Sequence, residues 1–345
     1  MKQFGGRVTK RLIERYSQSP NWKNDRFMNL VETTLQIHFH KVPKLLYKQL
    51  CKGKGRVPRA PIPVIPFLQS EFVSSSKLAK LVWYGHSAVL MRMANTTILI
   101  DPMFGSDAAP TAPFSVRRFS KHTLNILDEV PPVDLVLLTH DHYDHLDLAS
   151  IKKLRQKTGH FFVALGVARH LINWGIDPSK ITEFDWWNTH LFGNLSITFT
   201  PTRHFSGRGL TDRAKSLWGG WVLKTEKENI YFSGDSGYGP HFKEIGKKLG
   251  PFDFGLMECG QYNENWHQIH MFPEESVQAA LDAKVAKAMP VHWGGFALAQ
   301  HSWKEPVQRF VREAAMKRLP ILTPRVGELV TLADKTSISW WNSVD

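Results

Sequence analysis

The chain has 345 residues, a net charge of +13, 42% hydrophobic residues and 22% charged residues. This balance supports a packed core and excludes a disordered chain. Two cysteines, Cys51 and Cys259, are too few for a disulfide framework or a cysteine-rich zinc site. No apolar run reaches the roughly 18 residues of a transmembrane helix, and no apolar block of signal-peptide length stands at the N-terminus. We therefore expect a soluble, cytoplasmic protein of roughly two domains, or of one large domain with an extension.

The positive charge is concentrated near the N-terminus. Residues 1–60 hold 14 Lys and Arg against 3 Asp and Glu, whereas the remaining residues hold 30 against 28. Such a region is either a basic face for anionic lipid or nucleic acid, or an ordinary solvated surface. The absence of a long basic run favours the solvated surface. We keep an anionic membrane surface as a candidate partner, which would make the protein peripheral on the membrane. We expect no nucleic acid partner, and the sequence is compatible with an oligomer.

The first part of the chain is predicted to be an extension of the main domain. Residues 26–50 carry apolar side chains near helical spacing, which predicts a helix. The proline-rich stretch from Val57 to Pro66 must be extended, because proline cannot occupy a helix interior. We expect this stretch to be a linker that lies against the main domain. The predicted units are thus a basic, partly helical extension over residues 1–76 and a main domain over residues 77–345.

From residue 77 onward, short β-branched runs alternate with helical patterns. The strands come first in hairpin-like groups and later alternate with helices. This order predicts an α/β domain of two sheets with helices outside, layered αββα. Strands are predicted at 81–83, 88–93, 97–100, 133–138, 161–165, 195–200, 220–223, 230–232, 254–257 and 288–291. Helices are predicted at 148–158, 167–173, 240–249, 273–283 and 306–318.

One segment has the composition of a metal site. The run His140-Asp-His-Tyr-Asp-His145 directly follows a buried-strand pattern. Side chains at i and i+2 of an extended chain point the same way, so His140 and His142 can hold one ion. Asp144 and His145 follow as the chain turns toward the next helix, and they can face a second ion. Imidazole and carboxylate without thiolate suit zinc, and also iron or manganese.

Three later strand runs end on further ligand types, namely His204, Asp235 and His292. Open α/β sheets place their sites at the carboxyl ends of strands, a position that all of these residues share. A lone histidine at a strand end is more often a hydrogen-bonded surface residue. Beside the His140–His145 segment, however, these three residues are predicted to complete the site. Gly234 and Gly237 would allow close backbone approach around Asp235.

The run His140-Asp-His-Tyr-Asp-His145 resembles the HxHxDH motif of the metallo-β-lactamase superfamily, with the later His, Asp and His in the expected order. The resemblance extends from about Leu81 to Gln300. Within the superfamily, the chain is similar to the branch of phospholipases D that hydrolyse N-acyl-phosphatidylethanolamine. The stretches that carry this similarity are Trp83-Tyr-Gly-His-Ser-Ala-Val89, Ile100-Asp-Pro-Met-Phe104, Asp185-Trp-Trp187, Leu217-Trp-Gly-Gly-Trp221, Phe232-Ser-Gly-Asp-Ser-Gly-Tyr238, Glu244-Ile-Gly-Lys-Lys-Leu-Gly-Pro-Phe-Asp253 and Val291-His-Trp-Gly-Gly-Phe-Ala-Leu298.

This resemblance implies the four-layer metallo-β-lactamase sandwich and two divalent metal ions, with zinc as the first choice. It implies one ion held by two histidines of the motif and a later histidine, and a second held by the remaining motif residues and the last histidine. An aspartate and a hydroxide would bridge the two ions. The implied ligand set is His140, His142 and His204 for the first ion, Asp144, His145 and His292 for the second, and Asp235 for the bridge.

Four further residues are candidates around that centre. By the resemblance, Asp101 orients a ligand histidine, and His270 lies near the substrate phosphate, where it positions the phosphate or protonates the leaving alkoxide. Tyr143 can offer its phenol to the same oxygens. His86 either supports a ligand or packs within its strand.

The resemblance implies hydrolysis of a phosphodiester in a phospholipid, with Asp144, Asp235 and His270 as the catalytic residues. Three alternatives stay open. The first is a lactonase or another small phosphoester hydrolase on the same metals. The second is a nuclease, against which the nearly neutral charge after residue 60 argues. The third is a binding protein with a vestigial site, against which the intact set of predicted ligands argues.

Overall fold

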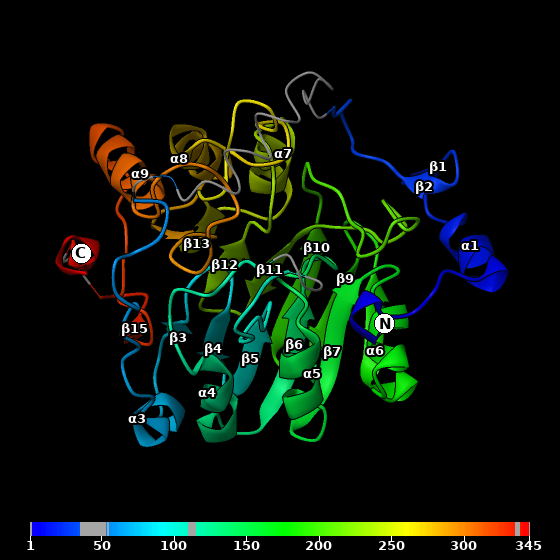
Figure 1. Ribbon diagram of the computed structural model, residues 1–345, viewed down its shortest axis with the longest axis horizontal. Coiled ribbons are helices and arrows are strands. Elements are labelled where there is room, and N and C mark those ends of the chain that lie inside the picture. Colours follow the sequence, from blue (N-terminus) through cyan, green and yellow to red (C-terminus); the bar gives the residue numbers. More distant parts are fainter. Residues whose placement is uncertain (1, 35–52, 54, 110–114, 335–338, 345) are drawn as a thin grey trace.

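Two β-sheets form the centre of the molecule, and helices lie outside them (Figure 1). Buried side chains of both sheets, such as Leu137 and Leu256, belong to one continuous hydrophobic core. The αββα layering predicted from the order of strands and helices is therefore confirmed. This computed structural model describes residues 2–34, 53, 55–109, 115–334 and 339–344.

The larger sheet has seven strands in the order β15-β3-β4-β5-β6-β7-β8. Pairing is antiparallel from β15 to β5 and parallel from β5 to β8. The parallel strands β6 and β7 are largely buried on both faces, which explains their continuous apolar sequences. The strands are β3 (Lys80–Trp83), β4 (Val89–Met93), β5 (Thr96–Ile100), β6 (Val133–Leu138), β7 (Thr158–Ala164), β8 (Ile181–Phe184) and β15 (Leu329–Thr331).

The smaller sheet has six strands in the order β14-β13-β12-β11-β10-β9. Here β12, β13 and β14 are parallel neighbours, and β9 to β12 pair in antiparallel fashion. The strands are β9 (Thr189–Phe192), β10 (Leu195–Thr200), β11 (Gly220–Lys224), β12 (Asn229–Phe232), β13 (Phe254–Glu258) and β14 (Ala288–Val291).

Helices connect the parallel strands, because a parallel pair needs a crossover that a tight turn cannot supply. In Figure 1, α7, α8 and α9 lie together on the side of β12 and β13, and α4 and α5 lie with β4 to β7. The main-domain helices are α4 (Thr123–Glu129), α5 (Leu148–Leu154), α6 (Ala168–Asn173), η3 (Pro178–Lys180), α7 (His241–Lys248), α8 (Pro273–Asp282), α9 (Glu305–Met316) and η4 (Trp340–Ser343).

Local sequence explains where these helices begin. Asp147 caps α5, because its carboxylate accepts hydrogen bonds from the backbone N–H groups of Ala149 and Ser150. Pro273 occupies the first turn of α8, where its missing N–H costs nothing. The predicted helix over 148–158 is shorter than expected, because Thr158 already pairs with Val133 at the start of β7.

The N-terminal segment contains short elements that pack on the main domain. They are η1 (Lys2–Phe4), α1 (Lys10–Tyr16), β1 (Trp22–Lys23), β2 (Arg26–Phe27) and, before the main sheet, α3 (Gln69–Val73). Tyr16, Trp22 and Phe27 form an aromatic cluster, with ring centroids 4.8 to 5.7 Å apart. Within the linker, the N–H of Ile62 donates to the carbonyl of Phe119, and Ile62 is buried.

Other predictions of secondary structure also fail within the described residues. The helix predicted over 26–50 is wrong for residues 26–34, which form β2 and then an irregular segment. Tertiary contacts explain the difference, because Phe27 donates from its backbone N–H to the carbonyl of Ala214 and Asn29 bonds to His204. The rest of that predicted helix lies outside the described residues. The sequence analysis also missed β8, β9 and β15, which are short and only partly buried.

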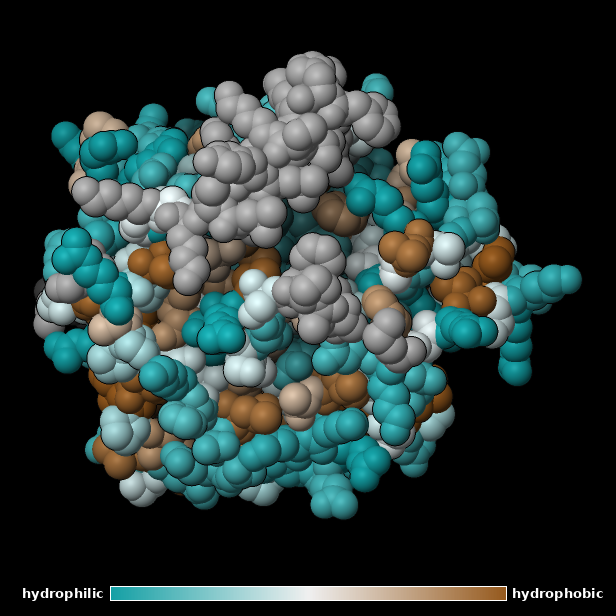
Figure 2. Space-filling view, viewed as in Figure 1, coloured by the Kyte–Doolittle hydropathy of each residue, from teal (hydrophilic) through white to brown (hydrophobic). Residues whose placement is uncertain are grey.

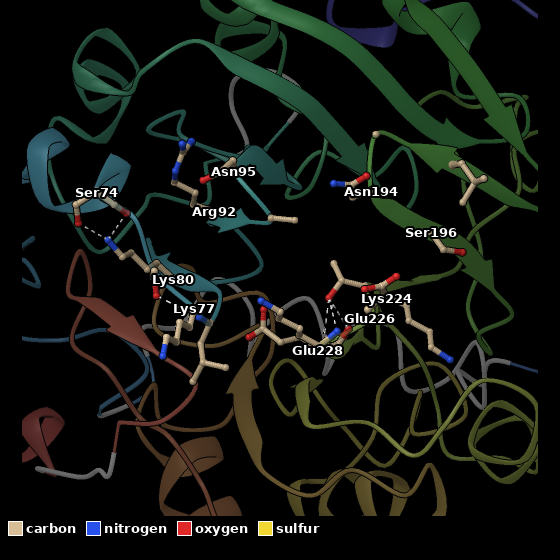
Figure 3. Close-up of a pocket in the computed structure, with 17 residues that line it drawn as sticks. Ser74, Lys77, Lys80, Arg92, Asn95, Asn194, Ser196, Lys224, Glu226 and Glu228 are labelled. Atoms are coloured by element: carbon tan, nitrogen blue, oxygen red, sulfur yellow. Dashed lines mark hydrogen bonds between the residues drawn. The ribbon is translucent and has the colours of Figure 1, made fainter.

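Among the described residues, no helix is long and apolar enough to cross a membrane. On the face in Figure 2, hydrophilic side chains predominate and hydrophobic ones form small separate groups, as is normal for a protein surface. A polar cleft of about 820 Å³ lies near the turns that precede β5, β10 and β12 (Figure 3). Lys77, Arg92, Lys224 and Glu228 are among the residues that line it.

The buried imidazole of His241 predicts a loss of stability in acid. His241 is 4% exposed, and its Nε2 lies 3.0 Å from Ser236 Oγ. Burial lowers the pKa of His241 to about 3, against about 6.5 in an unfolded chain. Between these values the unfolded state binds a proton that the folded state does not. The contribution of His241 to the free energy of unfolding should therefore fall by about 1.4 kcal/mol for each unit by which the pH drops below about 6.5.

Urea unfolding at pH 5 and pH 7 would measure this effect. The His241→Gln variant should lose less stability than the unmodified protein over that interval, by roughly one histidine's contribution. His190→Gln, at an exposed position, is the control and should keep the original pH dependence. An unchanged pH dependence in His241→Gln would contradict the prediction.

Candidate metal centre

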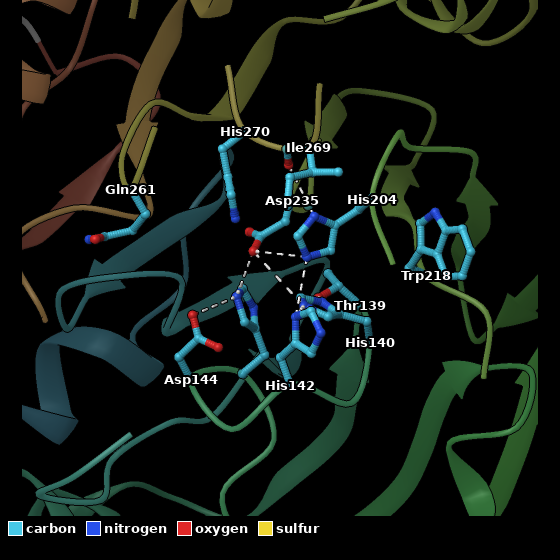
Figure 4. A network of polar contacts seen from close by, with 12 residues as sticks. Thr139, His140, His142, Asp144, His204, Trp218, Asp235, Gln261, Ile269 and His270 are labelled. Carbon is cyan, nitrogen blue, oxygen red and sulfur yellow. Dashed lines mark hydrogen bonds and ion pairs between the residues drawn. The ribbon is translucent and has the colours of Figure 1, made fainter. Parts of the chain in front are cut away.

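The predicted ligands converge at the carboxyl ends of strands from both sheets (Figure 4). The His140–His145 segment follows β6 of the larger sheet. His204, Asp235 and His292 follow β10, β12 and β14 of the smaller sheet. The two sheets therefore contribute opposite walls of one site, as expected for strand ends that meet at one edge.

The first group consists of three histidines. His140 Nε2 lies 2.9 Å from His142 Nδ1, and His204 Nε2 lies 3.2 Å from the same His142 nitrogen. A neutral imidazole has one N–H and one lone pair, so three nitrogens this close can offer three lone pairs to one ion. Burial lowers the pKa of His142, and burial also lowers the pKa values of His140 and His204 well below the usual range. All three rings are thus held in the neutral form that metal binding requires.

The second group consists of two histidines and an aspartate. His145 Nε2 and His292 Nε2 lie 3.3 Å apart, and each is 3.4 Å from Asp144 Oδ2. His86 joins this group, because its Nε2 lies 2.8 Å from the same Asp144 oxygen. Of the two functions considered for His86, the structure therefore favours support of a predicted ligand over simple packing in a strand.

Asp235 lies between the two groups. Its Oδ2 is 3.1 Å from the Nε2 atoms of His145 and His292, and 3.9 and 3.8 Å from those of His140 and His204. Its Oδ1 is buried without a hydrogen-bond partner among the described residues. The backbone comes close here: a Cβ on Gly234, which has φ +62°, would collide with the carbonyl oxygen of Gly219. A carboxylate at this place fits an ion on either side.

The charges of the second group also fit a cation. Burial opposes protonation of His292, yet the carboxylates of Asp235 and Asp144 outweigh it and raise the pKa of His292 to about 10. Burial alone would raise the pKa of Asp144, but the surrounding imidazoles, led by His145, hold it well below its usual range. The carboxylates thus create a negative site that takes up either protons or a metal cation. The nitrogen and oxygen donors, without sulfur, suit zinc, iron or manganese.

Asp101 fixes the orientation of one predicted ligand. Its Oδ2 lies 2.8 Å from His145 Nδ1 and accepts a 2.7 Å hydrogen bond from Thr139 Oγ1. Because the carboxylate accepts the Nδ1–H proton, the Nε2 lone pair of His145 points into the centre. Asp101 is fully buried and adopts a left-handed backbone conformation, with φ 41°.

A pocket of about 290 Å³ opens over the predicted ligands. His270 lines this pocket, and one of its ligand atoms lies within 4.8 Å of those of His204 and Asp235. The pocket wall is partly apolar, which gives the polar centre a hydrophobic rim. The apolar lining residues are Phe205, Trp266, Ile269 and Leu298.

The phenol of Tyr143, predicted to contact the substrate, contacts Arg208 in this structure. Its phenol donates a 2.6 Å hydrogen bond to the carbonyl of Arg208, and its ring centroid lies 4.0 Å from the Arg208 guanidinium carbon. Tyr143 is not among the described residues that line the pocket. The substrate contact of Tyr143 therefore stays a prediction.

Two residues that support the centre were not predicted from the sequence. Glu258 ends β13 and is fully buried beside His270. Its position at the end of a strand run, like that of Asp235, was a signal for it. Arg208 donates from Nη1 to the carbonyls of Asp141 and Leu146, at 2.7 and 2.8 Å. It thereby holds both ends of the loop that carries the predicted motif ligands, and nothing in the local sequence marks it.

Comparison with known proteins places this site in a family. The family described as "Beta-lactamase superfamily domain" matches residues 96–293. An uncharacterized protein of Mycobacterium tuberculosis is 34% identical over 332 residues, which cover 94% of this chain and 88% of the relative. An N-acyl-phosphatidylethanolamine-hydrolyzing phospholipase D of Caenorhabditis elegans is 31% identical over 291 residues, or 79% of this chain and 81% of the relative.

A solved structure has the same fold. A metallo-hydrolase from the archaeon Ignicoccus hospitalis superposes with a TM-score of 0.59 at 23% identity, over 75% of this chain and all of that chain. The family match and the phospholipase D relative, together with the buried cluster of histidines and carboxylates, identify the chain as a metal-dependent hydrolase. The chain belongs to the β-lactamase superfamily, in its metallo-hydrolase division, and it resembles the phospholipase D branch named above.

Removal of the Arg208 side chain is predicted to weaken metal binding. Arg208 is 4% exposed and bonds to two carbonyls of the motif loop. The Arg208→Ala variant should lose about 10- to 100-fold in metal affinity, because residues that hold ligands in place contribute to this extent. Titration of the zinc-loaded protein with a competing chelator would measure the loss. Arg92→Ala removes a half-buried arginine of the distant polar cleft and should leave the affinity unchanged; equal losses in both variants would contradict the prediction.

Proposed function

We propose that the protein is a binuclear phosphodiesterase that hydrolyses phospholipids of the N-acyl-phosphatidylethanolamine type, as a phospholipase D. The observation that carries this proposal is the pair of donor groups on either side of Asp235, with His270 on the wall of the same pocket. The nematode relative, whose name states this activity, aligns over four-fifths of its own length.

The donor set supports two divalent ions, with zinc as the first choice. His140, His142 and His204 would hold one ion, Asp144, His145 and His292 the other, and Asp235 would contact both. When bound, such a pair supplies a hydroxide nucleophile at neutral pH and positive charge opposite the phosphoryl oxygens. The chain itself contributes the buried, desolvated walls that strengthen these charge interactions.

His270 is the proposed proton donor. Its Nδ1 lies 2.5 Å from Glu258 Oε1, so the other ring nitrogen, Nε2, is available to the pocket. There the imidazole can position a phosphoryl oxygen or donate a proton to the leaving alkoxide. An alkoxide of high pKa needs this proton, whereas a phenolate does not.

The apolar rim supports a lipid substrate. Phe205, Trp266, Ile269 and Leu298 surround the polar centre, and the sites of small ligands and cofactors commonly combine apolar walls with a few oriented polar groups. The basic N-terminal region supports a second part of this proposal, in which the protein binds peripherally to an anionic membrane surface.

Lipid hydrolysis is the direct test. The zinc-loaded protein, incubated with N-acyl-phosphatidylethanolamine in mixed micelles, should release phosphatidic acid and N-acylethanolamine, detected by mass spectrometry. His142→Ala should lower the rate by at least about 100-fold, because even residues outside the coordination sphere contribute up to that factor. His267→Ala changes a histidine outside the ligand groups and should retain the activity. If protein with two bound metals releases no product, the substrate proposal is wrong and a lactone or small phosphoester takes its place.

Membrane binding is testable separately with vesicles. Lys10 and Arg11 are exposed in the first turn of α1, and each should contribute about 1 kcal/mol to binding at an anionic surface. The double variant Lys10→Glu/Arg11→Glu should sediment less with phosphatidylserine-containing vesicles than the unmodified protein. The control Lys152→Glu/Arg155→Glu changes two exposed cations at α5 and should not. Sedimentation that ignores the anionic lipid content would contradict this part of the proposal.

A further inference from the structure

A buried carboxylate links three residues of the candidate site. Glu258 stands at the last position of β13 and is fully buried. Its Oε1 lies 2.5 Å from His270 Nδ1 and 3.6 Å from His292 Nδ1. Its Oε2 accepts a 2.9 Å hydrogen bond from the backbone N–H of Ser236, the residue after Asp235.

The surroundings of Glu258 suggest more than a contribution to packing. A buried carboxylate is unfavourable unless hydrogen bonds or charges compensate for the loss of water. The backbone N–H of Ser236 satisfies one oxygen, and the other faces two imidazoles. The rings of His270 and His292 are nearly parallel, at 12° and with centroids 5.2 Å apart, so one oxygen addresses the Nδ1 edge of both.

The hydrogen bond determines which nitrogen of His270 faces the pocket. A carboxylate accepts but does not donate, so His270 must carry its proton on Nδ1. The Nδ1–Oε1 contact then sets the ring plane and leaves Nε2 as the nitrogen that does not face Glu258; a ring nitrogen of His270 lies within 4.8 Å of ligand atoms of His204 and Asp235.

We propose that Glu258 is a positioning residue that orients His270 and enables it to protonate the leaving oxygen of the substrate. The inference rests on the phosphodiesterase function proposed above. In the step concerned, a hydroxide oxygen forms a bond to phosphorus, and the bond from phosphorus to the leaving oxygen breaks with its electron pair on that oxygen. The ring that donates carries a proton on each nitrogen: its Nε2–H bond breaks, an O–H bond forms on the leaving alcohol, and the neutral ring keeps its proton on Nδ1 beside Glu258. His270 then regains a proton from water.

The substitution Glu258→Gln tests this assignment, because it keeps the size of the side chain and removes the charge. A carboxamide has one acceptor oxygen and cannot accept from both Ser236 and His270 as the carboxylate does. The variant should lose about 100-fold or more in kcat on N-acyl-phosphatidylethanolamine, whose leaving group is an alkoxide. On bis(p-nitrophenyl) phosphate, whose leaving group needs no proton, the loss should be only a few-fold.

Matched variants separate positioning from a general structural effect. Glu228→Gln changes a carboxylate that is 6% exposed, accepts from the Ala79 N–H and lines the distant polar cleft; both rates should stay unchanged. His270→Ala should reproduce the leaving-group pattern of Glu258→Gln, and the double variant should add little to either single loss. Glu258→Asp retains the charge, so its kcat on N-acyl-phosphatidylethanolamine should lie between those of Glu258→Gln and the unmodified protein. If Glu258→Gln does not fold, Glu258→Asp takes its place in the test.

A readout that does not depend on activity completes the test. In a histidine-selective ¹H–¹⁵N correlation spectrum of the zinc-loaded protein, His270 should carry a proton on Nδ1, and this signal should shift in Glu258→Gln. Equal rate losses on the two diesters, or an unchanged His270 signal, would overturn the assignment of Glu258. If the unmodified protein cleaves neither diester, the proposed function is wrong, while the spectrum still reports whether Glu258 positions His270.

Discussion

The crowding of nitrogen lone pairs and carboxylate oxygens at one buried edge is the constraint on which this molecule depends. Asp235 Oδ2 lies within 4 Å of four imidazole nitrogens, and its other oxygen has no hydrogen-bond partner among the described residues. Without a bound cation such a cluster is unfavourable, because buried polar groups that lack partners lose the stabilisation that water would give them. The family's metal-dependent chemistry resolves this conflict, since a cation satisfies several lone pairs at once.

The surrounding structure holds these groups in place against their mutual repulsion. Asp101 holds His145 from the larger sheet, and Glu258 lies behind His270 and His292 in the smaller one. Arg208 holds the loop between them through two backbone carbonyls. The supporting contacts therefore use charged groups that are themselves buried, and each is satisfied by more than one partner. The buried charged groups are thus concentrated around the centre, and the remaining interior is largely apolar.

The sequence was informative where function imposes a short spacing. His140 and His142 alternate along an extended chain, and their convergence follows from local geometry alone. The later ligands were found because they end strands that the apolar runs had already located. Glu258 directly follows the strand predicted at 254–257, so the rule that found Asp235 could also have found Glu258. The environment of Tyr143 depends on Arg208, 65 residues away, and no local pattern contains such a contact.

The helix expected from residue 26 fails for a similar reason, because Phe27 pairs with Ala214 instead of with its own neighbours.

Each donor group takes ligands from both sheets: two from the loop after β6, and one from the end of β10 or β14. A cation in either group would therefore act as a clasp between the two halves of the fold, in addition to the apolar core and to backbone hydrogen bonds such as the one that His86 donates to Trp293. A clasp of this kind binds the assembled sandwich and not the separated halves. Its occupancy adds to the stability of the whole domain in proportion to the logarithm of the free ion concentration. The same residues that prepare the site for chemistry thus make the persistence of the fold responsive to metal supply.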